Sequence, residues 1–218
     1  MIREYAAALA AYTDGQWLRY AYAREPLAGK LTERQRLEFY QGAVGCAAEQ
    51  AELWRERWGG AGVLELAAKA GVAVKFDTAV YDGVPAAFAT YSPADGVAIC
   101  ADIAAATDRL IAEEGLDALA GGVKTQDLLL AHELFHHIEN HTPDIYVLRK
   151  HVLLFKIGRW ENRSRLTCLA EVAAMAFAKA LTNLPCSPYI FDLLMLYAKN
   201  PQRAQKQFNG IQAICAAE

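Results

Sequence analysis

The sequence predicts an α+β fold that is mostly helical, with a small three-stranded, mainly antiparallel sheet and a helical segment at the N-terminus. Long stretches rich in alanine and leucine, two residues that favour helix, account for most of the chain. Three short segments, at residues 72–76, 86–91 and 97–100, have the alternation or composition of strands. The 218 residues are 54% hydrophobic, which is enough for a sizeable core.

Residues 1–60 form the first predicted unit, which we expect to be helical throughout. Two short helices should occupy most of the first 24 residues. Thr32 and Gln35 then have the spacing of a capping box, which predicts a longer helix from that point to about Trp58. No motif marks this segment, so we expect either a helical cover for the rest of the chain or a lobe that binds a partner.

Residues 61–218 form the second predicted unit. The strands at 86–91 and 97–100 flank a turn made of Ser, Pro, Ala, Asp and Gly, and should pair as a hairpin. Residues 146–160 are ambiguous, because they are strand-like in composition and Gly158 argues against a continuous helix. Helices are expected at residues 63–70, 103–114, 125–140, 166–184, 189–199 and 202–216.

Composition gives expectations about compartment and partners. The net charge of −3 and pI of about 6.0 give no global attraction to nucleic acid. A basic run at residues 149–165 could hold an acidic substrate or nucleic acid, although such charges more often form a solvated face. The five dispersed cysteines include no C-x-x-C pair, a pattern typical of thiols in a reducing compartment. With no signal peptide or membrane span in sight, we expect a cytoplasmic protein that binds neither membrane nor DNA directly.

One motif carries the chemistry of this chain. All five histidines lie between residues 132 and 151, and three of them belong to the sequence His132-Glu133-Leu134-Phe135-His136-His137. On a helix, positions i and i+4 share a face, so His132 and His136 can bind one metal ion together. Glu133 then lies where a general base for a metal-activated water is needed. The motif predicts a zinc-dependent hydrolase, and most simply a peptidase.

A catalytic zinc site needs a third protein ligand and an open position for water. His137 lies about 100° around the helix from His136 and cannot face the same ion. Glu171 is the strongest candidate, because it stands in a segment (residues 169–178) whose other residues are almost all small or apolar. An ionised carboxylate is costly there without a partner, and a metal would be that partner. The remaining histidine candidates are His141 and His151.

Plainer interpretations exist for each of these residues. The two motif histidines could be a hydrogen-bonded core pair, and Glu171 could be a first-turn carboxylate that faces solvent or pairs with Arg163 or Arg165. Glu139 is expected to be solvent-facing or to support a ligand from the outer shell. A hydrolase also needs a donor for the oxyanion of the transition state. The candidates for that transition-state stabiliser are Tyr146 and His151.

The motifs taken together resemble the ImmA/IrrE metallopeptidases. The likeness covers roughly residues 62–186, and its second motif consists of Glu171, Ala174, Phe177, Ala178, Leu181 and Pro185. Two positions depart from the family pattern, since Phe135 stands where Gly is common and Met175 where Asn is common. The resemblance implies a minimal zincin-like core in which His132, His136 and Glu171 hold Zn²⁺ and Glu133 is the catalytic base.

The resemblance also implies a protein substrate, which in known members is a helix-turn-helix transcriptional repressor. We therefore expect a zinc-dependent peptidase that hydrolyses a peptide bond in a protein or peptide. Two alternatives stay open: a catalytically weak or inactive zincin scaffold with a regulatory or interaction role, and a zinc hydrolase that acts on a small amide. An intact Glu133 argues against the inactive scaffold, which would have no need of a base. The oligomeric state does not follow from the sequence.

Overall fold

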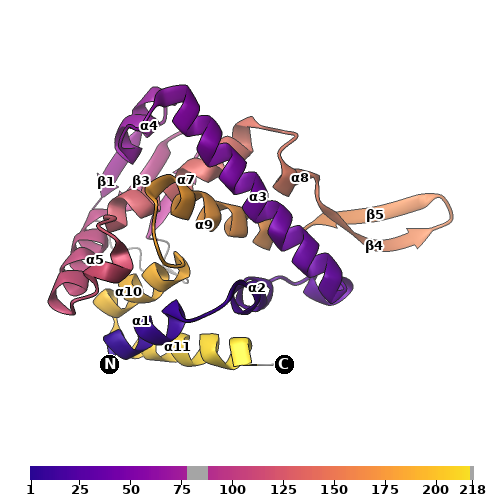
Figure 1. The fold of residues 1–218 in the computed structure, drawn as a ribbon. Helices are drawn as coiled ribbons and strands as arrows, with labels where there is room; N and C mark the ends of the chain where they lie inside the picture. The colour runs from indigo at the N-terminus through magenta and orange to yellow at the C-terminus, as the bar shows by residue number, and fades with distance from the viewer. Residues whose placement is uncertain (78–87, 217–218) are drawn as a thin grey trace.

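The computed structural model describes residues 1–77 and 88–216 and shows a mostly helical α+β protein, as predicted (Figure 1). Most of the predicted helices form within a few residues of their expected ends. The helices are α1 Ile2–Ala10, α2 Asp14–Tyr22, η1 Ala28–Lys30, α3 Glu33–Trp58, α4 Val63–Lys69, α5 Ala101–Glu113, α6 Asp117–Ala120, α7 Thr125–His141, α8 Tyr146–Arg149, α9 Cys168–Thr182, α10 Tyr189–Lys199 and α11 Pro201–Ala216. None of the helices in these ranges is long and apolar enough to cross a membrane.

Helix α3 begins as the sequence predicts. The Thr32 hydroxyl accepts a hydrogen bond from the backbone N–H of Gln35, and the Gln35 side chain accepts one from the backbone N–H of Thr32. Thr13 and Gln16 form a second capping box at the start of α2, which we had not predicted. Each box satisfies backbone donors that a helix start otherwise leaves without partners.

The three predicted strands form one small sheet, but its pairing differs from the prediction. Strands β2 Ala89–Ser92 and β3 Gly96–Cys100 make the expected antiparallel hairpin, whereas β1 Val74–Asp77 pairs with β3 in parallel. The sheet has the order β1-β3-β2 and is mixed, so "mainly antiparallel" was wrong. A local turn reveals a hairpin, but nothing local decides on which side of β3 the first strand lies. The first two residues of the predicted strand 86–91 lie outside the described residues.

The ambiguous segment after α7 contains a short helix and a second hairpin. Helix α8 is followed by β4 His151–Ile157 and β5 Trp160–Arg165, which pair antiparallel. Gly158 takes a φ of +58° in the turn between them, a conformation that suits glycine and ends the strand. In Figure 1 this hairpin projects away from the body of the molecule.

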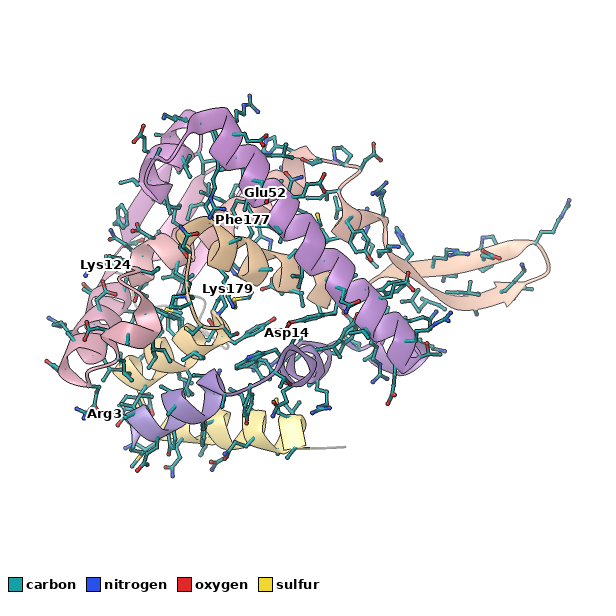
Figure 2. All side chains as sticks on the ribbon, viewed as in Figure 1. Arg3, Asp14, Glu52, Lys124, Phe177 and Lys179 are labelled. Carbon is teal, nitrogen blue, oxygen red and sulfur yellow. The ribbon has the colours of Figure 1, made fainter. Side chains whose placement is uncertain are left out.

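Helix α9 lies at the centre of the core, between α3 and α7. Phe177 of α9, labelled in Figure 2, is fully buried, with its ring centroid 5.8 Å from those of both Trp54 in α3 and Phe135 in α7. Helix α3 belongs to the segment 1–60, so both predicted units contribute to one hydrophobic core. The N-terminal helices therefore support the helix that carries Glu171.

A buried carboxylate ties the N-terminal segment to the start of α9. Glu25, between α2 and η1, is 6% exposed and accepts hydrogen bonds from the Thr167 hydroxyl and the Cys168 backbone N–H, both 3.0 Å long. It also accepts one from the backbone N–H of Leu27. Burial alone would raise the pKa of Glu25, but these hydrogen bonds outweigh it, so the pKa lies below its ordinary value. Glu25 thus caps α9 from a distant part of the chain.

We expect Glu25→Ala to lower the free energy of unfolding by about 3 kcal/mol, because the buried N–H of Cys168 and the hydroxyl of Thr167 lose their acceptor at the start of α9. The wild-type contribution should be fully present above the unfolded-state pKa of a glutamate and be lost as the pH falls through the lower folded-state pKa. Urea denaturation across acidic pH checks both points. Glu52→Ala, on the exposed face of α3, is the control; equal stability of the two variants would contradict this account.

Candidate metal centre

Helix α7 presents the motif residues on two adjoining faces. His132 and His136 lie one turn apart, with their side chains 16% and 20% exposed. Glu133 is buried, with 7% of its surface exposed. Its electrostatic interactions with His132 and His136 each lower its pKa. The helix can hold these polar groups because apolar residues anchor its other sides. The buried apolar residues of α7 are Leu128, Leu130, Ala131, Leu134, Phe135 and Ile138.

Three ligand atoms from two helices converge at one point. The Nε2 atoms of His132 and His136 lie 3.3 Å apart. The Glu171 carboxylate of α9 lies 3.5 Å from each of them, through Oε2 to His132 and through Oε1 to His136. These three side chains are also the described group of histidine, cysteine and acidic residues whose ligand atoms all lie within 4.8 Å of one another.

The size of this triangle matches one face of a zinc coordination sphere. Zinc binds nitrogen and oxygen ligands at about 2.0–2.1 Å in a tetrahedron, whose ligand–ligand edges are then roughly 3.3–3.4 Å. The observed separations of 3.3, 3.5 and 3.5 Å fit those edges. A metal over the centre of the triangle would have three protein ligands and one open position, the arrangement of a catalytic rather than a structural zinc site.

Glu171 occupies its predicted place for a partly different reason. We expected a buried carboxylate, but its side chain is 58% exposed, so the desolvation argument is weaker than the sequence suggested. It does lie in the first turn of α9. The ion pair with Arg163 or Arg165 that we considered as an alternative is not found among the described residues, where Glu171 pairs with His132 and His136. Glu171 faces the two histidines instead.

Electrostatic interactions and burial shift the pKa values of Glu171, His132 and Glu133. A hydrogen bond from His132 lowers the pKa of Glu171, although burial opposes this shift. Burial alone would lower the pKa of His132. The nearby Glu171 and Glu133 raise it by more than burial lowers it, so the net shift is upward. Burial raises the pKa of Glu133, a change that suits a base working near neutral pH. A metal ion at this point would take the place of the proton on His132, because zinc binds neutral imidazole.

An outer carboxylate orients one of the histidines. The Nδ1–H of His136 donates to Glu139 Oε2 at 3.2 Å, one turn further along α7. With the proton on Nδ1, the lone pair of Nε2 points toward Glu171 and His132. Carboxylate–histidine pairs of this kind fix the tautomer of metal ligands and make them more basic. Of the two roles considered for Glu139, the structure favours outer-shell support.

Glu139→Ala is expected to weaken zinc affinity roughly 10- to 100-fold without removing the site, because His136 loses the acceptor that fixes its ring. Competition with a fluorescent zinc chelator measures this. Glu52→Ala removes a carboxylate of the same charge from an exposed helix and should leave the affinity unchanged. If both variants bind zinc like the wild type, Glu139 does not support the ligand.

The other predicted candidates lie away from the triangle. The His141 Nδ1–H donates to the backbone oxygen of His137 at 2.8 Å. His151 is exposed and donates to the backbone oxygen of Arg149. Tyr146 packs against α3, where its ring leaves no room for a Cβ at Gly42. Neither Tyr146 nor His151 lines the cavity beside the triangle, so this structure does not bring the two predicted transition-state stabilisers to the candidate metal ligands.

A cavity of about 730 Å³ opens beside the triangle and contains polar residues that we did not predict. Asp192 of α10 interacts electrostatically with His132, and burial raises its pKa to about 7. It is an acidic residue in an otherwise apolar helix, so the reasoning that found Glu171 could also have found it. Tyr91 of β2 places its hydroxyl 3.2 Å from His137 Nδ1. Arg24 and Arg203 give another part of the wall positive charge.

Comparisons with protein-family models, with curated proteins and with solved structures find no match to this chain. The assignment of the site therefore depends on its own geometry and on the chemistry of its residues.

Proposed function

We propose that this chain is a zinc-dependent peptidase with a zincin-like core, related to the ImmA/IrrE metallopeptidases. The observation that carries the proposal is the triangle of His132, His136 and Glu171, whose edges match a tetrahedral zinc site. A hydrogen-bonded pair of core histidines would not need a carboxylate from a second helix at equal distance from both rings. The buried Glu133 next to the triangle supports a catalytic rather than a purely structural role.

Zinc bound to these three residues would act as a Lewis acid and would lower the pKa of a water molecule to about 7. Glu133 is the group that accepts the proton of the attacking water and later delivers it to the leaving amine. Burial raises its pKa, while the backbone N–H of Tyr91 hydrogen-bonds to it and holds it against β2. Glu139 accepts a hydrogen bond from His136, and Asp192 interacts electrostatically with His132.

An extended polypeptide is the substrate that the cavity suits best. Strand β2 is an edge of the described sheet, and Ala89, Thr90 and Tyr91 line the cavity. Edge strands bind extended peptides by adding a strand to the sheet. Strand β3, which we also considered for this role, lies in the centre of the sheet with both sides paired. The resemblance to ImmA/IrrE proteins adds the proposal that the substrate is a transcriptional repressor.

The compartment belongs to the same proposal. None of the five cysteines forms a disulfide, and four of them are buried. Reduced, buried thiols are common in proteins of reducing compartments, and we propose that the protein works in the cytoplasm.

The experiment that tests the function combines metal analysis with cleavage of a peptide library. The purified chain should bind about one zinc ion. It should create new N-termini in a proteome-derived peptide mixture, detected by mass spectrometry, and chelation should stop this until zinc is restored. Failure to bind zinc would contradict the metal centre. One bound zinc with no cleavage of peptides or folded proteins would favour the inactive scaffold instead.

A further inference from the structure

The tip of the β4–β5 hairpin exposes three large apolar side chains that the metal centre does not use. Ile157 is 67% exposed, Trp160 61% and Phe155 43%. Ile157 and Trp160 are cross-strand partners, and the rings of Phe155 and Trp160 are 5.4 Å apart, so the three side chains lie on one face. We call these three residues the apolar tip. On the other face, Lys156 and Arg163 form ion pairs with Glu161.

This hairpin lacks the support that its composition requires. A two-stranded hairpin alone is marginally stable in water, and it usually needs a further strand or a packing surface. Figure 1 shows β4 and β5 extending from the body, with only their base near the rest of the fold. Val152, near that base, is buried, whereas the tip is not. The apolar tip therefore has the character of a surface that is covered by something else.

The charge of the hairpin indicates what covers it. Residues 151–165, which make up the hairpin and its turn, contain four basic residues and one acidic residue, a net charge of +3. The rest of the chain contains 18 basic and 24 acidic residues, a net charge of −6. A basic hairpin is thus attached to an acidic body, and the body of a second copy is an electrostatic match for it.

The chain also contains an apolar cavity that could receive such a tip. A cavity of about 850 Å³ lies between α2, α3 and α9, apart from the metal triangle. Its walls include Trp17, Tyr40 and Tyr189, and Leu37 is 46% exposed among its lining residues. Two of its charged lining residues, Asp14 of α2 and Lys179 of α9, are labelled in Figure 2. We call this space the α3–α9 cavity.

We propose that the protein forms a dimer in which the apolar tip of each copy docks into the α3–α9 cavity of the other. The hairpin projects away from its own body, so its tip fits a neighbour better than itself. In a two-fold symmetric dimer each tip occupies the cavity of the other copy. No tip or cavity is then left free, so the assembly stops at two copies. Met175 and Pro188 line this cavity and the metal-site cavity alike, so a docked tip would contact the wall between the two.

Sedimentation of the intact protein over a range of concentrations tests the proposal, and it requires neither zinc nor a substrate. The wild type should be a dimer at micromolar concentration. A variant with Phe155→Ser, Ile157→Ser and Trp160→Ser should raise the dissociation constant by roughly two orders of magnitude or more. Leu64→Ser removes a similarly exposed apolar side chain from α4 and should leave the dimer intact. A dimer that survives the triple substitution would overturn the proposal.

A second variant leaves the hairpin untouched and changes only the cavity. Gly45 of α3 lines the cavity, and a Cβ added there meets nothing within 4 Å. Gly45→Trp should therefore obstruct docking while improving helix propensity, whereas Gly45→Ala should leave the dimer as it is. Dimerisation of Gly45→Trp with wild-type affinity would overturn docking in this cavity. A monomeric wild type whose tip instead binds anionic lipid vesicles or an oligonucleotide would overturn the dimer.

Discussion

Replacing Glu133 with Gln is expected to lower the rate of peptide hydrolysis by about 10²- to 10⁴-fold, the usual contribution of general acid–base catalysis. The amide has nearly the size of the carboxylate but cannot accept a proton from water. Zinc content should stay close to that of the wild type, because the three proposed ligands are unchanged. Cleavage of a library-derived peptide, with kcat and KM measured separately, checks the prediction.

The control for this variant must separate chemistry from folding. Glu139→Gln alters a carboxylate on the same helix, nearly two turns beyond the base, but leaves Glu133 in place. It should retain most of the rate per bound zinc. The Glu133→Gln protein should also hold its substrate uncleaved, which allows the substrate to be trapped from a lysate. If Glu133→Gln cleaves a substrate at the wild-type rate, the peptidase mechanism proposed for Glu133 is wrong.

Loss of either motif histidine is expected to have the second large effect. His132→Ala and His136→Ala should each remove tight zinc binding, because two ligands cannot complete the tetrahedral site. Glu171→Ala should weaken binding without unfolding the protein, since this side chain is more than half exposed. Metal analysis after gel filtration in zinc-free buffer measures all three.

His137→Ala is the matched control, because it removes a histidine from the same helix. His137 faces Tyr91 rather than the triangle, and the variant should keep its zinc. Full zinc content in both His132→Ala and His136→Ala would exclude the proposed centre. Unchanged affinity in Glu171→Ala alone would show that the third ligand is a different residue.

The local parts of the fold were predictable from the sequence. Capping residues, helix-favouring composition and Pro or Gly at the ends give most helices, and helix α10 matches its predicted range of 189–199. The β2–β3 hairpin was predictable because its turn is local, with only three residues between the paired Ser92 and Gly96. The parallel partner of β3 was not, because its pairing depends on how distant helices pack. The segment 146–160 stayed ambiguous because β4 is mostly apolar in composition but, apart from Val152, is largely exposed.

The site was partly predictable for the same physical reason. A helix fixes the relative positions of His132, Glu133 and His136, so their spacing alone gives their geometry. Glu171 was found through its apolar neighbours, although the structure shows it facing an open cavity. Asp192 carried the same signal and was missed. Tyr146 and His151 were selected for their chemistry, and only the three-dimensional structure could show that α8 and β4 hold them elsewhere.

The contact between Glu25 and the start of α9 has a consequence for the order of events during synthesis. Glu25 accepts hydrogen bonds from Thr167 and Cys168, which follow it in the sequence by 142 and 143 positions. The two histidines leave the ribosome well before Glu171, and the helix that presents Glu171 is capped only when it meets the segment translated first. Until then the nascent chain holds an incomplete ligand set. We therefore expect the proposed zinc site to become able to bind metal tightly only late in synthesis, as a product of long-range folding rather than of the motif helix alone.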